Sequence, residues 1–184
     1  NHRGFVEALV ASNRIGADVL LLNTSFAGPA MAEVIDREGA DVVIYDQEFS
    51  DTVDRALQNT PGATRILGWV DTDDGTPTVD ALIDTHLGHR PGPSERTSNI
   101  VLLTSGTTGT PKGAKRSEGS GGAGDLKAVL DRTPWRAEEP IVIAAPMFHA
   151  WGFSQLLFAG LLACTVVTRR KFDAEATLQL NDRH

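Results

Sequence analysis

The sequence has few of the residues that characterise disulfide-rich, nucleic-acid-binding or membrane-spanning proteins. It contains one cysteine in 184 residues, which cannot build a disulfide framework, so we expect an intracellular setting. Its 17 basic residues are outnumbered by 24 acidic ones, and the formal charge of −7 argues against nucleic acid as a partner. Residues 140–168 carry no formal charge, but proline, histidine, glutamine and glycine interrupt them, so no apolar run is long enough to cross a bilayer.

The sequence does contain a repeated alternation of short apolar runs with amphipathic segments. Six runs that predict buried strands are residues 17–22, 41–45, 65–69, 99–103, 141–145 and 165–168. Helices are predicted around Phe5–Leu9 and over residues 29–38, 51–58, 125–132, 154–163 and 173–180. Such an alternation predicts an α/β fold built from βαβ units around a parallel sheet.

A polar segment rich in proline and glycine, residues 88–94, separates two series of these elements. We therefore predict a first α/β series over 1–90, forming a flavodoxin-like part of the sheet, and a second over 91–184. The chain starts without methionine, inside an apparent helix, and ends on Asn181-Asp-Arg-His184. We expect it to be a portion of one longer domain.

The strongest chemical signal is the segment T-S-G-T-T-G-T-P-K-G, residues 104–113, which follows the run at 99–103. Its glycines allow backbone N–H groups to approach a ligand, its hydroxyls donate hydrogen bonds, and its lysine supplies a positive charge. A polyphosphate site requires these properties, and a carboxylate, which would repel phosphate, is missing from the segment. The segment is not a Walker A loop, because Pro111 stands where that motif has its second glycine.

The segment resembles the phosphate loop of adenylate-forming enzymes, whose pattern [ST]-S-G-[ST]-T-G-x-P-K-G it matches at every position. Two later segments extend this resemblance. Pro146–Gly152 resembles the P-x-F-H-x-x-G segment of fatty-acyl-CoA and aryl-CoA synthetases, and Arg170–Glu175 resembles the segment that follows it. The chain most resembles the long-chain fatty-acid–CoA ligases, which implies part of the large N-terminal domain of such an enzyme.

The resemblance implies activation of a fatty acid by ATP and Mg²⁺ to an acyl-adenylate, followed by thioester formation with CoA. The residues implied to bind the ATP phosphates are Thr104, Ser105, Gly106, Thr107, Thr108, Gly109 and Lys112. Thr104 is also implied as a Mg²⁺ ligand, Lys112 and His149 as catalytic residues, and His149, Trp151 and Gly152 as substrate contacts. His149 also fits a histidine ordered by local hydrogen bonds at a strand end, and Trp151 also fits a core residue.

The segments with which this family binds adenine and ribose are not found after Leu180, and neither is the small C-terminal domain that carries its catalytic lysine. We therefore expect the 184 residues alone to be inactive and to self-associate through the apolar 140–180 region. Two other functions stay open: an acyl-AMP ligase that loads a carrier protein, and a non-catalytic remnant that binds nucleotide or a partner chain. We expect a cytoplasmic protein without a transmembrane segment, and peripheral membrane contact stays open.

Overall fold

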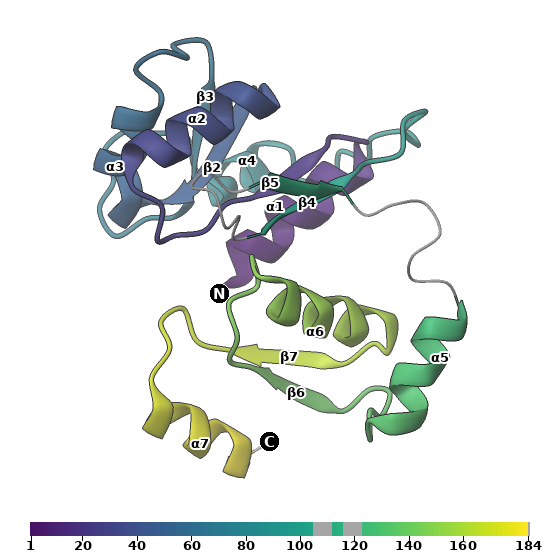
Figure 1. The fold of residues 1–184 in the computed structure, drawn as a ribbon. Helices are drawn as coiled ribbons and strands as arrows, with labels where there is room; N and C mark the ends of the chain where they lie inside the picture. Colours follow the sequence, from purple (N-terminus) through teal and green to yellow (C-terminus); the bar gives the residue numbers. More distant parts are fainter. Residues whose placement is uncertain (105–111, 116–122, 184) are drawn as a thin grey trace. The chain divides into compact units, whose positions relative to one another are not determined.

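The computed structural model describes residues 1–104, 112–115 and 123–183, which form two compact units (Figure 1). The N-terminal unit comprises Arg3–Ala114. The C-terminal unit comprises Asn1–His2 together with the chain from Lys115 onward.

The N-terminal unit contains two parallel strand pairs and the helices between them. Its elements are α1 (Arg3–Arg14), β1 (Val19–Leu21), α2 (Gly28–Glu38), β2 (Val42–Asp46), the 3₁₀ helix η1 (Gln47–Phe49), α3 (Ser50–Ala56), β3 (Thr64–Trp69), α4 (Val79–Thr85), β4 (Ile100–Thr104) and β5 (Lys112–Lys115), whose last residue is counted with the C-terminal unit. Strand β1 pairs in parallel with β4, in the register Val19↔Ile100, and β5 is the next neighbour of β4. Strand β2 pairs in parallel with β3, in the register Val42↔Thr64.

Helix α2 shows how the sequence determines the core of this unit. Its first turn contains proline, and it ends at Gly39, whose φ of 65° is the left-handed conformation that glycine adopts readily. Three side chains of α2 are buried, Met31 at 5%, Val34 at 0% and Ile35 at 1% exposure. The buried cluster that includes the helix and its neighbours consists of Met31, Ile35, Val43, Val53, Ala56, Leu57 and Ala63. Helices α2 and α3 thus pack together beside the β2–β3 pair (Figure 1).

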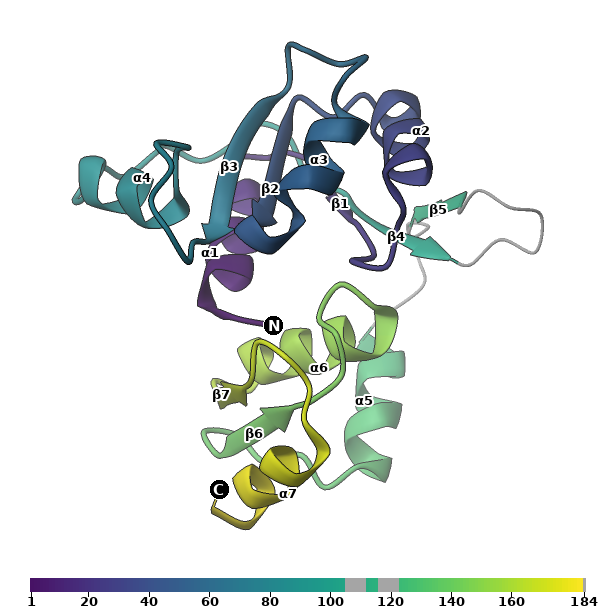
Figure 2. The ribbon, with the colours of Figure 1, turned by 90° about the vertical axis from the view of Figure 1, so that its left-hand side faces the viewer.

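The C-terminal unit contains a third parallel pair. Its elements are α5 (Ala123–Arg132), β6 (Pro140–Ile143), α6 (Ala150–Leu161), β7 (Thr165–Thr168) and α7 (Ala174–Arg183). Strand β6 pairs in parallel with β7, from Pro140↔Thr165 to Ile143↔Thr168, and α6 is the crossover between them. Helix α6 lies on one face of the pair and α7 on the other (Figure 2). Four residues of α6 are buried: Gly152, Phe153, Leu156 and Ala159.

The predicted α/β fold with parallel βαβ pairing is confirmed, although several elements differ from the prediction. Helix α4 was not predicted, although Thr78 caps it by accepting a 3.0 Å hydrogen bond from the Ala81 N–H. Strand β5, with the sequence Lys-Gly-Ala-Lys, has no apolar run and was not predicted either. Helix α6 begins four residues before the predicted Ser154, and β6 ends two residues before the predicted Ala145.

The compact units do not coincide with the predicted series 1–90 and 91–184. Strand β4, which was expected to open the second series, pairs with β1 and so belongs to the N-terminal unit. The division at residue 90 stays a prediction about organisation along the chain. Within the described part of the chain, every helix is too short or too polar to span a membrane.

Candidate functional site

The predicted phosphate loop joins two neighbouring strands of one sheet. Thr104 is the last residue of β4 and Lys112 is the first residue of β5. Ser105, Gly106, Thr107, Thr108 and Gly109 lie outside the described residues. Because β4 and β1 run in parallel, the loop leaves the carboxyl end of a parallel pair, which is where open α/β sheets bind their ligands.

Asp18 holds the amino-terminal end of β4 in place through contacts with Asn99. Its carboxylate accepts hydrogen bonds from the Asn99 backbone N–H at 2.8 Å and from the Asn99 side-chain amide at 3.1 Å, and it forms an ion pair with Arg96. The Val19 N–H in turn donates to the Asn99 carbonyl at 2.8 Å. These contacts determine the register of β1 on β4, and they therefore determine where the chain enters the predicted phosphate loop.

Magnesium is the metal that the family resemblance implies, with Thr104 as its protein ligand. A threonine hydroxyl is a hard oxygen ligand, and Mg²⁺ commonly binds through substrate phosphates with few protein ligands. Among the described residues, no group of three or more histidine, cysteine, aspartate or glutamate side chains is arranged to hold a metal ion. The hydroxyl oxygen of Thr104, at the end of β4, is chemically suited to a Mg²⁺ ion whose other ligands are phosphate oxygens and water.

The second predicted segment is the connection from β6 to α6. Met147 is buried at 1% exposure, and its neighbours lie near the surface. His149 is the N-cap residue of α6, with φ −98° and ψ 148°, and its side chain makes no capping hydrogen bond. Its backbone is fixed on both sides, since its N–H donates to the Pro146 carbonyl at 3.0 Å and its carbonyl accepts from the Phe153 N–H at 2.8 Å. The exposed imidazole is therefore presented by an ordered backbone, and it is available to a ligand.

Gly152 allows a close approach between α6 and the loop that precedes it. A Cβ atom at this position would lie 2.6 Å from the carbonyl carbon of Pro146 and 2.7 Å from the carbonyl oxygen of Ala145, with the Pro146 oxygen closer still. Only glycine fits there without moving the backbone. The glycine of the P-x-F-H-x-x-G segment thus has a packing role, and its predicted contact with substrate stays a prediction.

The two aromatic residues beside Gly152 differ in burial. Phe153 is buried at 5% exposure, whereas Trp151 is 69% exposed in the first turn of α6. The interpretation of Trp151 as a core residue is therefore wrong for this structure. Farther along, Asp173 caps α7 by accepting a 2.7 Å hydrogen bond from the Ala176 N–H, so the family-like segment Arg170–Glu175 positions this helix.

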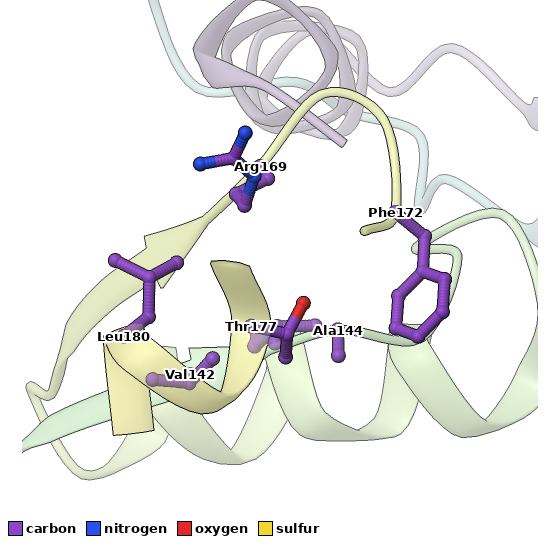
Figure 3. A pocket seen from close by; sticks show the side chains of 7 residues that line it. Val142, Ala144, Arg169, Phe172, Thr177 and Leu180 are labelled. Carbon is purple, nitrogen blue, oxygen red and sulfur yellow. The ribbon is translucent and has the colours of Figure 1, made fainter. Parts of the chain in front are cut away.

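A small hollow opens in the C-terminal unit between β6 and α7 (Figure 3). It is lined by Val142, Ile143, Ala144, Arg169, Phe172, Thr177 and Leu180. None of these residues was predicted to belong to the site. Its lining is mostly apolar, with the Arg169 side chain as the single charged group.

The predicted site residues thus belong to two units. Thr104 and Lys112 belong to the N-terminal unit, and His149, Trp151 and Gly152 belong to the C-terminal unit. Each set follows the carboxyl end of a parallel strand pair, β1–β4 or β6–β7. Sequence reasoning missed Asn1, which makes hydrogen bonds to the β6–α6 loop about 145 positions away along the chain.

Comparisons with known proteins agree on one family. The family model described as "AMP-binding enzyme" matches residues 1–184. A feruloyl-CoA synthase from Amycolatopsis sp is 30% identical over 184 residues, covering 97% of this chain and 34% of the relative. A long-chain-fatty-acid–CoA ligase from Mycobacterium tuberculosis is 25% identical over 165 residues, covering 88% of this chain and 31% of the relative. The chain therefore spans about a third of the length of the curated relatives it matches.

A solved structure supports the same fold. The o-succinylbenzoate–CoA synthetase from Bacillus subtilis, crystallised with ATP and magnesium, superposes with a TM-score of 0.71 at 19% identity. The match covers 100% of this chain and 46% of the crystallised one.

Proposed function

The chain belongs to the AMP-binding enzyme family, and from this premise we propose that it is the ATP-binding portion of a carboxylic acid–CoA ligase. The carboxylate of the acid attacks the α-phosphorus of ATP, giving an acyl-adenylate and pyrophosphate. The thiol of CoA then attacks the acyl carbon and releases AMP. The observation that carries the proposal is the segment 104–113, which matches a phosphate-binding pattern and begins at the carboxyl end of a parallel strand pair.

The segment is assigned to the ATP phosphates. The hydroxyls of Thr104, Ser105, Thr107 and Thr108 hydrogen-bond the β- and γ-phosphates, and Gly106 and Gly109 allow the backbone to follow them. Lys112 offsets the charge of the departing pyrophosphate. When bound beside Thr104, Mg²⁺ supplies further positive charge to the phosphates. The protein's contribution to such a reaction is mainly positioning and electrostatic stabilisation, so a loop of this kind supplies a large part of the catalysis.

The β6–α6 segment is assigned to the acid. The exposed His149 imidazole can donate a hydrogen bond to a carboxylate oxygen whether it is neutral or charged. Trp151, exposed in the first turn of α6, offers an apolar surface to the acyl group. We assign the acid to the fatty acids, because Pro146–Gly152 matches a segment that fatty-acyl-CoA and aryl-CoA synthetases share, and a long-chain-fatty-acid–CoA ligase is among the relatives of the chain.

The substrate assignment is tested with the protein translated from the complete reading frame that contains this chain. Purified protein is supplied with ATP, Mg²⁺, CoA and a panel of medium- and long-chain fatty acids, hydroxycinnamic acids and arylacetic acids. We expect thioester formation to be fastest with fatty acids. Preference for an aromatic acid would overturn the fatty-acid assignment, and transfer to a carrier protein but not to CoA would favour the acyl-AMP ligase. Absence of ATP-dependent chemistry with retained nucleotide binding would favour the non-catalytic remnant.

Replacement of His149 by alanine tests its assigned contact with the carboxylate. Loss of one hydrogen bond of ordinary net strength, about 1 kcal/mol, lowers kcat/KM for the acid about fivefold and leaves the KM for ATP near its wild-type value. The matched control is His89→Ala, which removes an exposed loop histidine from the N-terminal unit. An unchanged kcat/KM for the acid in His149→Ala would contradict the assignment.

The 184-residue chain is expected to self-associate through the 140–180 region. Trp151, Leu161, Phe172 and Leu178 are 61–70% exposed there, and apolar side chains in such numbers favour association. Light scattering as a function of protein concentration measures this directly. A stable monomer at high concentration would contradict the expectation.

A further inference from the structure

The side chain of Asn1 holds the backbone of the β6–α6 loop at two points. Its Nδ2 donates to the Ala145 carbonyl at 2.8 Å, with a longer 3.5 Å contact to the Ile143 carbonyl. Its Oδ1 accepts from the Met147 N–H at 2.8 Å. One primary amide thus satisfies a carbonyl and an N–H that flank Pro146, as one residue of a neighbouring strand would.

Other contacts hold the same loop together with the two hydrogen bonds from Asn1. The loop begins where β6 ends, and there the Thr168 hydroxyl donates to the Ile143 carbonyl at 2.8 Å. The Met147 side chain is buried at 1% exposure, and the Pro146 carbonyl accepts from the His149 N–H at 3.0 Å. Without Asn1, the Met147 N–H and the Ala145 carbonyl would lose the hydrogen bonds that hold the loop just before the N-cap of α6. His149 follows Met147 by two residues, so this backbone determines where the imidazole is presented.

We propose that Asn1 is a positioning residue, which fixes the β6–α6 loop and thereby places the His149 imidazole for the acid. The part of this inference that concerns His149 rests on the function proposed above. The two hydrogen bonds from Asn1 to Ala145 and Met147, which we call the Asn1 clamp, do not depend on the proposed function. Catalytic groups need support of this kind, because a small displacement of the contacting atom costs much of its effect.

The test combines amide exchange with a double-mutant cycle in the protein from the complete reading frame. Asn1→Ala removes both hydrogen bonds of the clamp. Asn1→Asp keeps the oxygen that accepts from Met147 and replaces the donor to Ala145 by a second acceptor, so it tests the two contacts separately and is the second variant should Asn1→Ala fail to fold. Asn181→Ala, which removes an exposed amide from α7 in the same unit, is the matched control.

In Asn1→Ala we expect the Met147 amide to exchange roughly threefold to tenfold faster, as expected for the loss of one net hydrogen bond. We expect kcat/KM for the acid to fall about fivefold at an unchanged KM for ATP. In the His149→Ala background, Asn1→Ala should slow the reaction no further, since the two residues act through one contact. Asn181→Ala should change none of these quantities.

Unchanged exchange at Met147 in Asn1→Ala would overturn the clamp. The positioning role would be overturned if the Met147 amide exchanges faster in Asn1→Ala but the losses in kcat/KM of Asn1→Ala and His149→Ala add in the double variant. Additive losses are expected of a merely structural residue, which acts independently of His149. A wild-type protein that activates no acid would refute the proposed function and, with it, the role toward His149. The Met147 exchange would still decide on the clamp by itself, so the two failures are distinguishable.

Discussion

Replacement of Lys112 by alanine is expected to slow adenylate formation about 10- to 150-fold and to leave the fold intact. The lysine is the single cation of the 104–113 segment, and the reaction separates a highly charged pyrophosphate anion from the α-phosphorus. A charge-assisted hydrogen bond is worth about 1.5–3 kcal/mol, which converts to this range of rates. Single-turnover formation of the acyl-adenylate in the protein from the complete reading frame measures the effect.

The matched control for this prediction is Lys115→Ala. Lys115 is the other lysine of β5, so this variant removes the same charge from the same strand outside the segment. We expect its rate to stay within about threefold of wild type, because the phosphate-loop pattern ends at Gly113 and assigns no role to Lys115. Equal losses in the two variants would show a general effect of net charge and would contradict the specific role of Lys112.

Replacement of Gly152 by alanine is expected to lower the free energy of unfolding by about 3 kcal/mol, near the upper end of the usual cost of overpacking. The three atoms nearest to the new methyl group belong to the backbone of Ala145 and Pro146, and none of them can rotate away. For a chain of this size the midpoint of thermal unfolding should fall by roughly 6–12 °C. Because the strain falls on the loop that carries His149, activity toward the acid should fall as well.

Gly160→Ala provides the control within the same helix. A Cβ at Gly160 would meet nothing within 4 Å, so the substitution adds no clash and gains helix propensity. We expect a midpoint equal to or slightly above that of wild type. If both glycine variants were equally destabilised in thermal melts, the close approach of α6 to Pro146 would not be the cause.

Most of the fold could be predicted from the sequence, because the parallel strands are short apolar runs separated by amphipathic segments. Val42–Asp46 and Thr165–Thr168 are rich in β-branched residues, which favour strands, and the structure confirms both. Strand β5 has none of these residues, and its pairing with β4 is what makes it a strand. Helix α4 was predictable in principle from the Thr78 cap followed by Val79, Leu82 and Ile83, but it has only seven residues.

The start of α6 shows a limit of local sequence reasoning. Gly152 resembles a loop residue because glycine is a poor helix former. This position of the helix is a glycine because a larger residue would collide with Pro146, and that reason depends on tertiary packing. Asn1 is a stronger case, since its contacts with Ala145 and Met147 join residues about 145 positions apart. The phosphate-binding roles were predictable because the segment 104–113 matches a specific pattern, and they stay predictions.

The most direct test of the account is acid-dependent exchange of labelled pyrophosphate into ATP, measured with the protein from the complete reading frame. This exchange reports the first half-reaction alone, so it requires neither CoA nor a carrier protein. The account predicts exchange that depends on added carboxylic acid and on Mg²⁺ and that falls about 10- to 150-fold in Lys112→Ala. A folded protein that binds ATP but shows no acid-dependent exchange with any acid of the panel would contradict it.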